Sequence, residues 1–261
     1  MQFEDLLYEE RGHVAYITIN RPQVYNAFRP KTADELIEAF NMAGWNRDIG
    51  VIVFGGAGDK AFCTGGDQSE HDGQYQSARG STGMPVDVLH AIIRNVPKPV
   101  IARVQGYAIG GGNVLTVICD MTICSESAKF GQVGPKMGSV DPGYGTAYLA
   151  RVVGEKKARE IWYMCRQYSG REAVEMGLAN VCVPDDKLDE EIEKWCAELV
   201  QRSPTAIAIA KRSFNVDTEH IAGIGQLGFE ALRMYYNTAE SQEGVKALAE
   251  KRKPEFRKYL E

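Results

Sequence analysis

The chain has 261 residues, of which 44% are hydrophobic and 25% are charged, and its formal net charge is −5. This length and composition fit one large globular domain, or a domain with a smaller appendage, that buries a substantial core. The negative balance argues against a surface that coats nucleic acid, because such a surface needs excess Lys and Arg to neutralise phosphates.

The first part of the chain predicts a hairpin, a helix and a buried strand. Apolar and polar residues alternate over Phe3–Glu9 and His13–Asn20, on either side of Glu10-Arg11-Gly12, which indicates two antiparallel strands. Apolar residues recur at helical spacing over Lys31–Trp45. Val51–Phe54 is continuously apolar, as is typical of a strand buried in a parallel sheet.

The middle of the chain alternates helices and strands after a polar loop. Asp67–Met84 shows no hydrophobic period, so it is predicted to be a loop that lies over a ligand. We then expect a helix over Val86–Asn95, a strand over Pro99–Val104, a helix over Gly111–Cys119 and a strand over Met121–Cys124. This alternation predicts an α/β fold with a largely parallel sheet and crossover helices.

Glycine and proline interrupt the pattern over Phe130–Gly145, which is predicted to be irregular and whose single carboxylate is Asp141. A strand is expected at Ala179–Val183. Helices are expected on both sides of that strand, at Thr146–Val153, Glu155–Tyr163, Ala173–Met176, Leu188–Arg202, Pro204–Phe214, Ile221–Asn237 and Ser241–Leu260. We therefore expect a core over residues 1–200 and a separate C-terminal helical region over residues 201–261.

The six cysteines are scattered, with no CxxC pair and no metal-ligand spacing, so reduced and mostly buried thiols are expected. Cys63 lies beside a glycine pair, but no patterned histidine supports a nucleophilic role. Four potential metal ligands stand close together in the polar loop, but such loops commonly have this composition, and no metal is expected: Asp67, Glu70, His71 and Asp72.

The first residues, MQFEDLLYEERG, carry acidic side chains early and lack the charged-then-apolar pattern of a signal peptide. No run approaches the ~20 apolar residues that a membrane span requires. We therefore expect a cytoplasmic protein with no membrane partner.

Two glycine-rich turns follow apolar runs, and they point to a site for negative charge. Gly110-Gly111-Gly112 stands where a strand passes into a helix, and Gly65-Gly66 follows the strand predicted at Val51–Phe54. Backbone without Cβ atoms can approach a ligand closely, and free N–H groups at a helix start favour anions. Two such donors would suit a developing oxyanion. The alternative is that the three glycines only form a tight strand-to-helix crossing.

Four segments together, HVAYITINRP, KAFCTGGDQ, KPVIARVQGYAIGGGN and FGQ, resemble the crotonase (enoyl-CoA hydratase/isomerase) superfamily over essentially the whole chain. The resemblance implies ββα units around a spiral core, a C-terminal helical layer that trimerises, and a homotrimer or dimer of trimers. It also implies an acyl-CoA substrate, with no cofactor beyond the CoA that the substrate carries. Gly66 and Gly111 match the two backbone donors of the family's oxyanion hole.

The chain departs from the family's hydratases at their two glutamates, because Val114 and Gly134 stand at those places. Neither residue can transfer a proton, so hydration by a pair of acids is not expected. Asp141 occupies the loop position used by a Dieckmann-type subgroup. Within it, FGQVGPKMGSVDPGYG, AREIWYMCRQY and KRKPEF resemble the 1,4-dihydroxy-2-naphthoyl-CoA synthases and the 2-ketocyclohexanecarboxyl-CoA hydrolases.

Differences from the synthases favour ring opening. Some synthases bind bicarbonate through a Gln-Thr-Gly turn that a tryptophan helps to enclose; here the turn is Gln132-Val133-Gly134, and Trp162 is retained. The lost hydroxyl weakens an anion site, and Tyr25 and Val245 replace basic residues of the synthase pattern. We expect hydrolysis of 2-ketocyclohexanecarboxyl-CoA to pimeloyl-CoA. The alternatives are the synthase reaction, for which alone bicarbonate is possible, and a non-catalytic protein that binds acyl-CoA or RNA.

Under this hypothesis Asp141 is the general base that activates water, while Gly66 and Gly111 hold the thioester oxygen. Tyr236 protonates the α-carbon or positions the group that does, and in the resembling enzymes this tyrosine can reach a site assembled with a neighbouring subunit. Tyr235 faces about 100° away on the predicted helix and is expected to pack. The remaining candidate substrate contacts are Ser139, Tyr144, Trp162, Gln132, His71 and Lys251.

Overall fold

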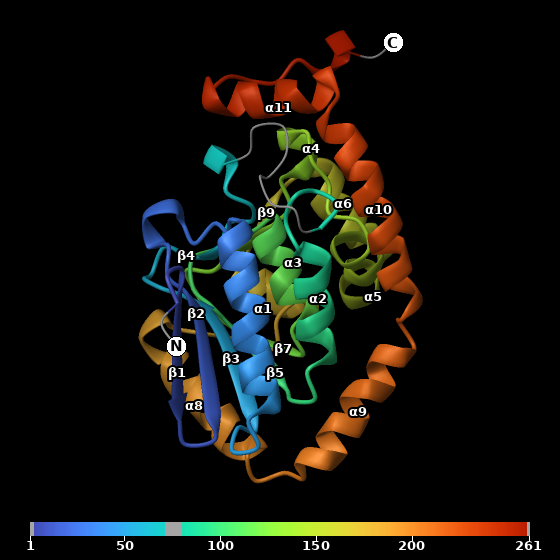
Figure 1. Cartoon of the computed structure of the whole chain (residues 1–261). Coiled ribbons are helices and arrows are strands. Elements are labelled where there is room, and N and C mark those ends of the chain that lie inside the picture. The colour runs from blue at the N-terminus through green and yellow to red at the C-terminus, as the bar shows by residue number, and fades with distance from the viewer. Residues whose placement is uncertain (1–2, 71–79, 260–261) are drawn as a thin grey trace.

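The computed structural model describes residues 3–70 and 80–259 and places them in two sheets surrounded by helices (Figure 1). The larger sheet has six strands in the order β1-β2-β3-β5-β7-β10. Its strands are β1 (Leu6–Arg11), β2 (Val14–Ile19), β3 (Val51–Gly56), β5 (Val100–Val104), β7 (Met121–Ser125) and β10 (Val181–Val183). β1 and β2 form the predicted antiparallel hairpin, and all the other pairings in this sheet are parallel, as predicted.

β3 is buried on both faces because its side chains alternate between two cores. Ile52 and Phe54 pack into the main core, where the Phe54 ring meets Phe40 of α1 (Pro30–Trp45) edge-on with 5.4 Å between ring centroids. Val51 and Val53 face the opposite side, where they pack against helix α8 (Leu188–Leu199). A central strand of this kind has no solvent-facing side, which explains its continuously apolar sequence.

A second sheet of four short strands is the main difference from the prediction. Its order is β4 (Ala61–Cys63), β6 (Tyr107–Ile109), β8 (Lys129–Gly131) and β9 (Gln167–Ser169). The chain passes from the larger sheet into this one three times, from β3 to β4, from β5 to β6 and from β7 to β8, which generates the spiral core. The passage from β5 to β6 turns at Gly106, which has a φ of +64° and whose Cβ would lie 2.1 Å from the Lys60 carbonyl oxygen.

The helices cover the sheets and close the chain (Figure 1). They are α1 (Pro30–Trp45), α2 (Val86–Asn95), α3 (Gly111–Ile118), α4 (Gly134–Met137), α5 (Leu149–Val153), α6 (Glu155–Met164), α7 (Gly170–Glu175), α8, α9 (Pro204–Val216), α10 (His220–Tyr236) and α11 (Ala239–Ala249). α9 to α11 form the C-terminal helical region, in which α9 and α10 run along one side of the molecule and α11 lies over α4.

Two predictions about local structure were wrong. The segment Phe130–Gly145, predicted to be irregular, contains the end of β8 and the short helix α4, and it runs into a π-helical turn at Tyr144–Tyr148. The tail predicted as helical to Leu260 leaves α11 at Ala249, and the backbone enters the left-handed region at Lys251, which has a φ of +53°. All six cysteines are free thiols, five of them buried, which confirms that prediction. In the described ranges no helix has the length and apolarity needed to cross a membrane.

The loop that carries Asp141 rests directly on the backbone of α10. A Cβ on Gly143 would lie 2.7 Å from the Gly225 Cα, and a Cβ on Gly228 would lie 2.2 Å from the Pro142 Cβ. The same face of α10 continues through buried Phe229, Leu232 and Tyr236. Glycine on α10 therefore lets the Asp141 loop approach closely enough to share a surface with Tyr236.

We expect Gly228→Ala to lower the free energy of unfolding by about 1–3 kcal/mol, because the added methyl group overlaps Pro142. Gly223→Ala is the matched control on the same helix: its Cβ meets nothing within 4 Å. Alanine there should raise the free energy of unfolding by up to about 1 kcal/mol through helix propensity. Urea unfolding measures both changes, and equal shifts in the two variants would contradict the contact.

Candidate functional site

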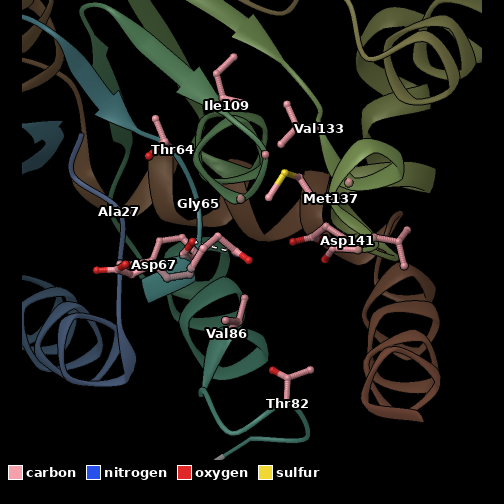
Figure 2. Close-up of a pocket in the computed structure, with 18 of the residues that line it drawn as sticks. Ala27, Thr64, Gly65, Asp67, Thr82, Val86, Ile109, Val133, Met137 and Asp141 are labelled. Carbon is pink, nitrogen blue, oxygen red and sulfur yellow. Dashed lines mark hydrogen bonds between the residues drawn. The ribbon is translucent and has the colours of Figure 1, made fainter. Parts of the chain in front are cut away.

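A cavity of about 450 Å³ lies where the two glycine turns, the loop after β8 and the helices α10 and α11 meet. In Figure 2 Asp141 and Met137 lie on the opposite side of the cavity from Asp67 and Ala27. The structure brings seven of the predicted site residues into its lining: Gly66, Gly111, Gln132, Ser139, Asp141, Trp162 and Tyr236.

The two glycine turns touch each other at one end of the cavity. Gly65 has a φ of +89°, and a Cβ on it would lie 3.0 Å from the Gly111 nitrogen. A Cβ on Gly112 would lie 1.9 Å from the carbonyl oxygen of Cys63, so α3 can start against β4 only with glycine there. The three glycines thus form a tight strand-to-helix crossing, as the alternative interpretation of the sequence predicted. They also bring two amides into one cavity.

The amides of Gly66 and Gly111 have no hydrogen-bond acceptor within the described part of the chain. The Phe28 N–H donates to the Gly65 oxygen and the Asp67 N–H to the Phe28 oxygen, each at 2.9 Å, so the intervening Gly66 N–H points the other way. Gly111 is the first residue of α3, where N–H groups lack intrahelical partners. Two donors of this kind can accept an anionic oxygen.

Asp67 follows Gly66 in the cavity wall and is already paired. Its Oδ2 lies 2.9 Å from the Arg21 Nη1, and both side chains are buried. Burial raises the pKa of Asp67, but the Ser69 hydrogen bonds and the Arg21 charge outweigh it, so the pKa lies below its usual value. Asp67 is therefore ionised, and its ion pair with Arg21 holds the Gly66 turn in place. No metal-binding group of side chains occurs among the residues described.

Asp141 lies in the opposite wall and has no charged partner among the described residues. Its Oδ1 is buried and has no hydrogen bond to any described residue. Burial raises the pKa of Asp141 to about 7, and the backbone amide of Gly145 partly opposes this rise. Val114 of α3 stands close by, since a Cβ on Gly145 would lie 3.1 Å from both the Asp141 Oδ1 and the Val114 Cγ2. A carboxyl group with this pKa can take up or release a proton near neutral pH.

Tyr236 reaches the cavity of its own chain. Its hydroxyl group lies 2.8 Å from the Ser139 Oγ. Burial raises the pKa of Tyr236 to about 12; the Ser139 hydrogen bond opposes this rise and the nearby Asp141 adds to it. Tyr235 instead lies outside the cavity lining, with its hydroxyl 3.4 Å from Glu240. The phenol of Tyr236 is thus protonated at neutral pH and available as a donor.

Gln132 and Trp162 add two more polar side chains to the lining. Gln132 is 1% exposed, and neither its Nε2 nor its Oε1 has a partner among the described residues. The Trp162 Nε1–H donates to the Gly145 carbonyl oxygen. A Cβ on Gly134 would lie 2.4 Å from the backbone carbonyl oxygen of Ser139 and 2.7 Å from the Trp162 Cζ3. A glutamate at position 134 therefore has no room here.

Three predicted substrate contacts are not brought into the cavity. Tyr144 is buried outside the lining, where its ring meets His90 with 5.7 Å between centroids and the Arg94 guanidinium lies 5.4 Å from the ring centre. Lys251 is exposed beyond the end of α11. His71 lies outside the described residues. Burial raises the pKa of Cys63 to about 12, which leaves it unreactive as a nucleophile.

The apolar wall of the cavity was not predicted from the sequence. This wall is made by Val133, Met137, Phe229, Leu232 and Leu248. Helical spacing could have found part of it, because Phe229, Leu232 and Tyr236 are three and four residues apart and so share one face of α10.

The chain matches the family model described as enoyl-CoA hydratase/isomerase over residues 9–259. Among solved structures, an enoyl-CoA hydratase from Mycobacterium avium subsp. paratuberculosis is 25% identical, with a TM-score of 0.86 and coverage of 97% of this chain and 98% of that one. An enoyl-CoA hydratase/carnithine racemase from Magnetospirillum magneticum is 29% identical, with a TM-score of 0.76 and coverage of 97% and 95%. An enoyl-CoA hydratase from Bacillus anthracis is 28% identical, with a TM-score of 0.73 and coverage of 96% and 98%.

The family match spans nearly the whole chain, and the three similar structures each cover 96% or more of it. The chain therefore belongs to the enoyl-CoA hydratase/isomerase family of the crotonase superfamily, whose members are mostly enzymes that act on acyl-CoA thioesters.

Proposed function

We propose that this protein hydrolyses the ring C–C bond of a cyclic β-ketoacyl-CoA thioester, with 2-ketocyclohexanecarboxyl-CoA as substrate and pimeloyl-CoA as product. One observation carries the proposal: among the described residues of the cavity lining, Asp141 is the one carboxylate without a charged partner, and it faces two backbone amides that lack acceptors. Val114 and Gly134 stand where the hydratases of this family carry acids, so a two-acid hydration has no counterpart here.

In the proposed reaction the thioester oxygen lies between the N–H groups of Gly66 and Gly111. Asp141 takes a proton from water as the water oxygen adds to the ring ketone. When the tetrahedral adduct collapses, the new carboxyl group forms, the ring C–C bond breaks, and its electron pair moves onto the thioester as an enolate. The two amides stabilise that enolate, and removal of one such donor typically costs about 10²–10³ in rate.

Tyr236 supplies the proton that ends the reaction at the α-carbon. Its raised pKa keeps the phenol protonated, and the hydroxyl of Ser139 at 2.8 Å can orient it and return a proton. The proton that Asp141 removed from water then restores the tyrosine through solvent. Each molecule of substrate takes up one molecule of water and the CoA thioester bond stays intact. Because nothing is oxidised or reduced, no cofactor is required.

The cavity lining supports an alicyclic substrate. Its wall is apolar at Val133, Met137, Phe229, Leu232 and Leu248, which suits a saturated ring. No Lys, Arg or His side chain belongs to the described part of the lining, so a substrate with a second carboxylate lacks a cation there.

One observation favours a second candidate, the ring-forming reaction of the 1,4-dihydroxy-2-naphthoyl-CoA synthases. The unpartnered amide of Gln132 lies in the same lining as Trp162, and it could hold a small anion such as bicarbonate. Ring formation and ring opening share the thioester enolate, so the two reactions use the same amides.

Incubation of the protein with each CoA ester, followed by mass spectrometry, separates these reactions. We expect 2-ketocyclohexanecarboxyl-CoA to gain the mass of one water without added bicarbonate. The synthase substrate would instead lose one water, with a rate that depends on bicarbonate. Hydration of a straight-chain enoyl-CoA with no change in the cyclic ester would contradict the proposal.

Asp141→Asn should lower turnover by about 10²–10⁴ because the base is lost, while acyl-CoA binding stays within about twofold. In the wild type the active form of the base is the carboxylate, whose pKa is about 7, so kcat/KM should rise with pH through that value. The Asn variant should lack this dependence. Steady-state rates and calorimetric binding measure both, and full activity of the variant would remove Asp141 from the reaction.

Tyr236→Phe should lower turnover by about 10²-fold or more, since it removes the proton donor but keeps the ring in the apolar wall. Tyr235→Phe on the same helix is the matched control and should change turnover little, because Tyr235 lies outside the lining. If the two variants turn over alike, the proton must come from another group.

We also propose that the chain assembles as a homotrimer or a dimer of trimers through its C-terminal helices. Large apolar side chains are exposed on α9 and α10, among them Phe214 at 78% and Leu227 at 77%. Exposed apolar surface of this kind is typical of subunit interfaces.

A further inference from the structure

Trp162 touches both ends of the loop that carries Ser139 and Asp141. At the start of this loop, Gly134 has no side chain, and the indole Cζ3 lies in the space that a Cβ would occupy. At its end, the indole Nε1–H donates to the carbonyl oxygen of Gly145. Trp162 is 6% exposed, so most of its ring is packed inside the protein.

Gly145 in turn faces the carboxyl group of Asp141. A Cβ on Gly145 would lie 2.9 Å from the Asp141 Cβ and 3.1 Å from its Oδ1, so the two residues are in direct contact. The amide of Gly145 also interacts with the carboxylate and opposes the rise that burial causes in its pKa. Gly145 is thus held at its carbonyl by Trp162 while its amide acts on Asp141.

We propose that Trp162 is a positioning residue for Asp141: by holding the carbonyl group of Gly145, it fixes this residue and so sets how the Gly145 amide and the enclosing loop meet the Asp141 carboxylate. This inference rests on the proposed role of Asp141 as general base. A direct contact between the indole and the acyl group is the competing explanation, because Trp162 also lines the cavity.

The other groups packed around Asp141 limit what else could move its pKa. Val114 of α3 is apolar, and Pro142 continues the loop onto α10. From α10, Tyr236 is the titratable group whose charge couples to Asp141 among the described residues. Tyr236 is neutral below its pKa of about 12, so it does not titrate in the range where Asp141 does.

Trp162→Phe removes the N–H and keeps an aromatic ring against Gly134. We expect the pKa of Asp141 to rise by at least about half a unit, because the Gly145 amide loses its fixed position beside the carboxylate. We also expect kcat to fall by about tenfold or more, with KM within about twofold, since a displaced base affects the chemical step.

The pKa is measured without turnover, by carbon-13 NMR titration of protein labelled at the aspartate carboxyl groups. Asp141→Asn identifies the resonance. Trp195→Phe is the matched control, because it also removes an indole N–H bond, the 2.7 Å contact with Glu191 on α8, and should leave the pKa of Asp141 unchanged. Replacement of Trp162 by benzothienylalanine, which keeps the bicyclic ring and lacks the N–H, serves if the phenylalanine variant does not fold.

An unchanged pKa of Asp141 in the folded variant, together with a higher KM for acyl-CoA, would overturn the inference in favour of a substrate contact. The titration also separates this result from failure of the proposed function. If no cyclic ester is turned over, the pKa of Asp141 still reports whether Trp162 positions it.

Discussion

The loop that carries Asp141 packs directly on the backbone of α10, and this contact determines which groups share the cavity. Pro142 and Gly143 lie against α10 where Gly225 and Gly228 present no side chain. About two turns further along this helix, Tyr236 meets Ser139, a residue 97 positions away in the sequence. One packing contact therefore brings a carboxylate, a phenol and a hydroxyl together, opposite the two glycine amides.

Burial of the Asp141 carboxyl group without a charged partner gives this residue its reactivity and weakens folding. Between the ordinary carboxyl pKa and about 7, the folded protein holds a proton that the unfolded chain releases, so stability from this group falls as pH rises through that window. Two other buried charged groups form ion pairs, Asp67 with Arg21 and Lys211 with Asp120. This contrast supports a chemical role for Asp141 rather than a structural one.

Features that depend on local spacing were predictable. The helix α2 spans Val86–Asn95 as expected, and the hairpin and the buried strand β3 follow from alternating and continuous apolar runs. The four strands of the smaller sheet were missed because three residues are too few to show a period. Their pairing also joins segments far apart in the chain, which no local pattern records.

The sequence by itself determined the two glycine turns, the lack of acids at positions 114 and 134, and the single carboxylate in the loop after β8. Only the tertiary structure decided that the Asp141 Oδ1 is buried without a charged partner, that Tyr236 rather than Tyr235 meets Ser139, and that Tyr144 packs against His90 outside the cavity. The reason is physical: residue spacing reflects contacts within one element, whereas burial and pairing arise between elements that meet only when the chain folds.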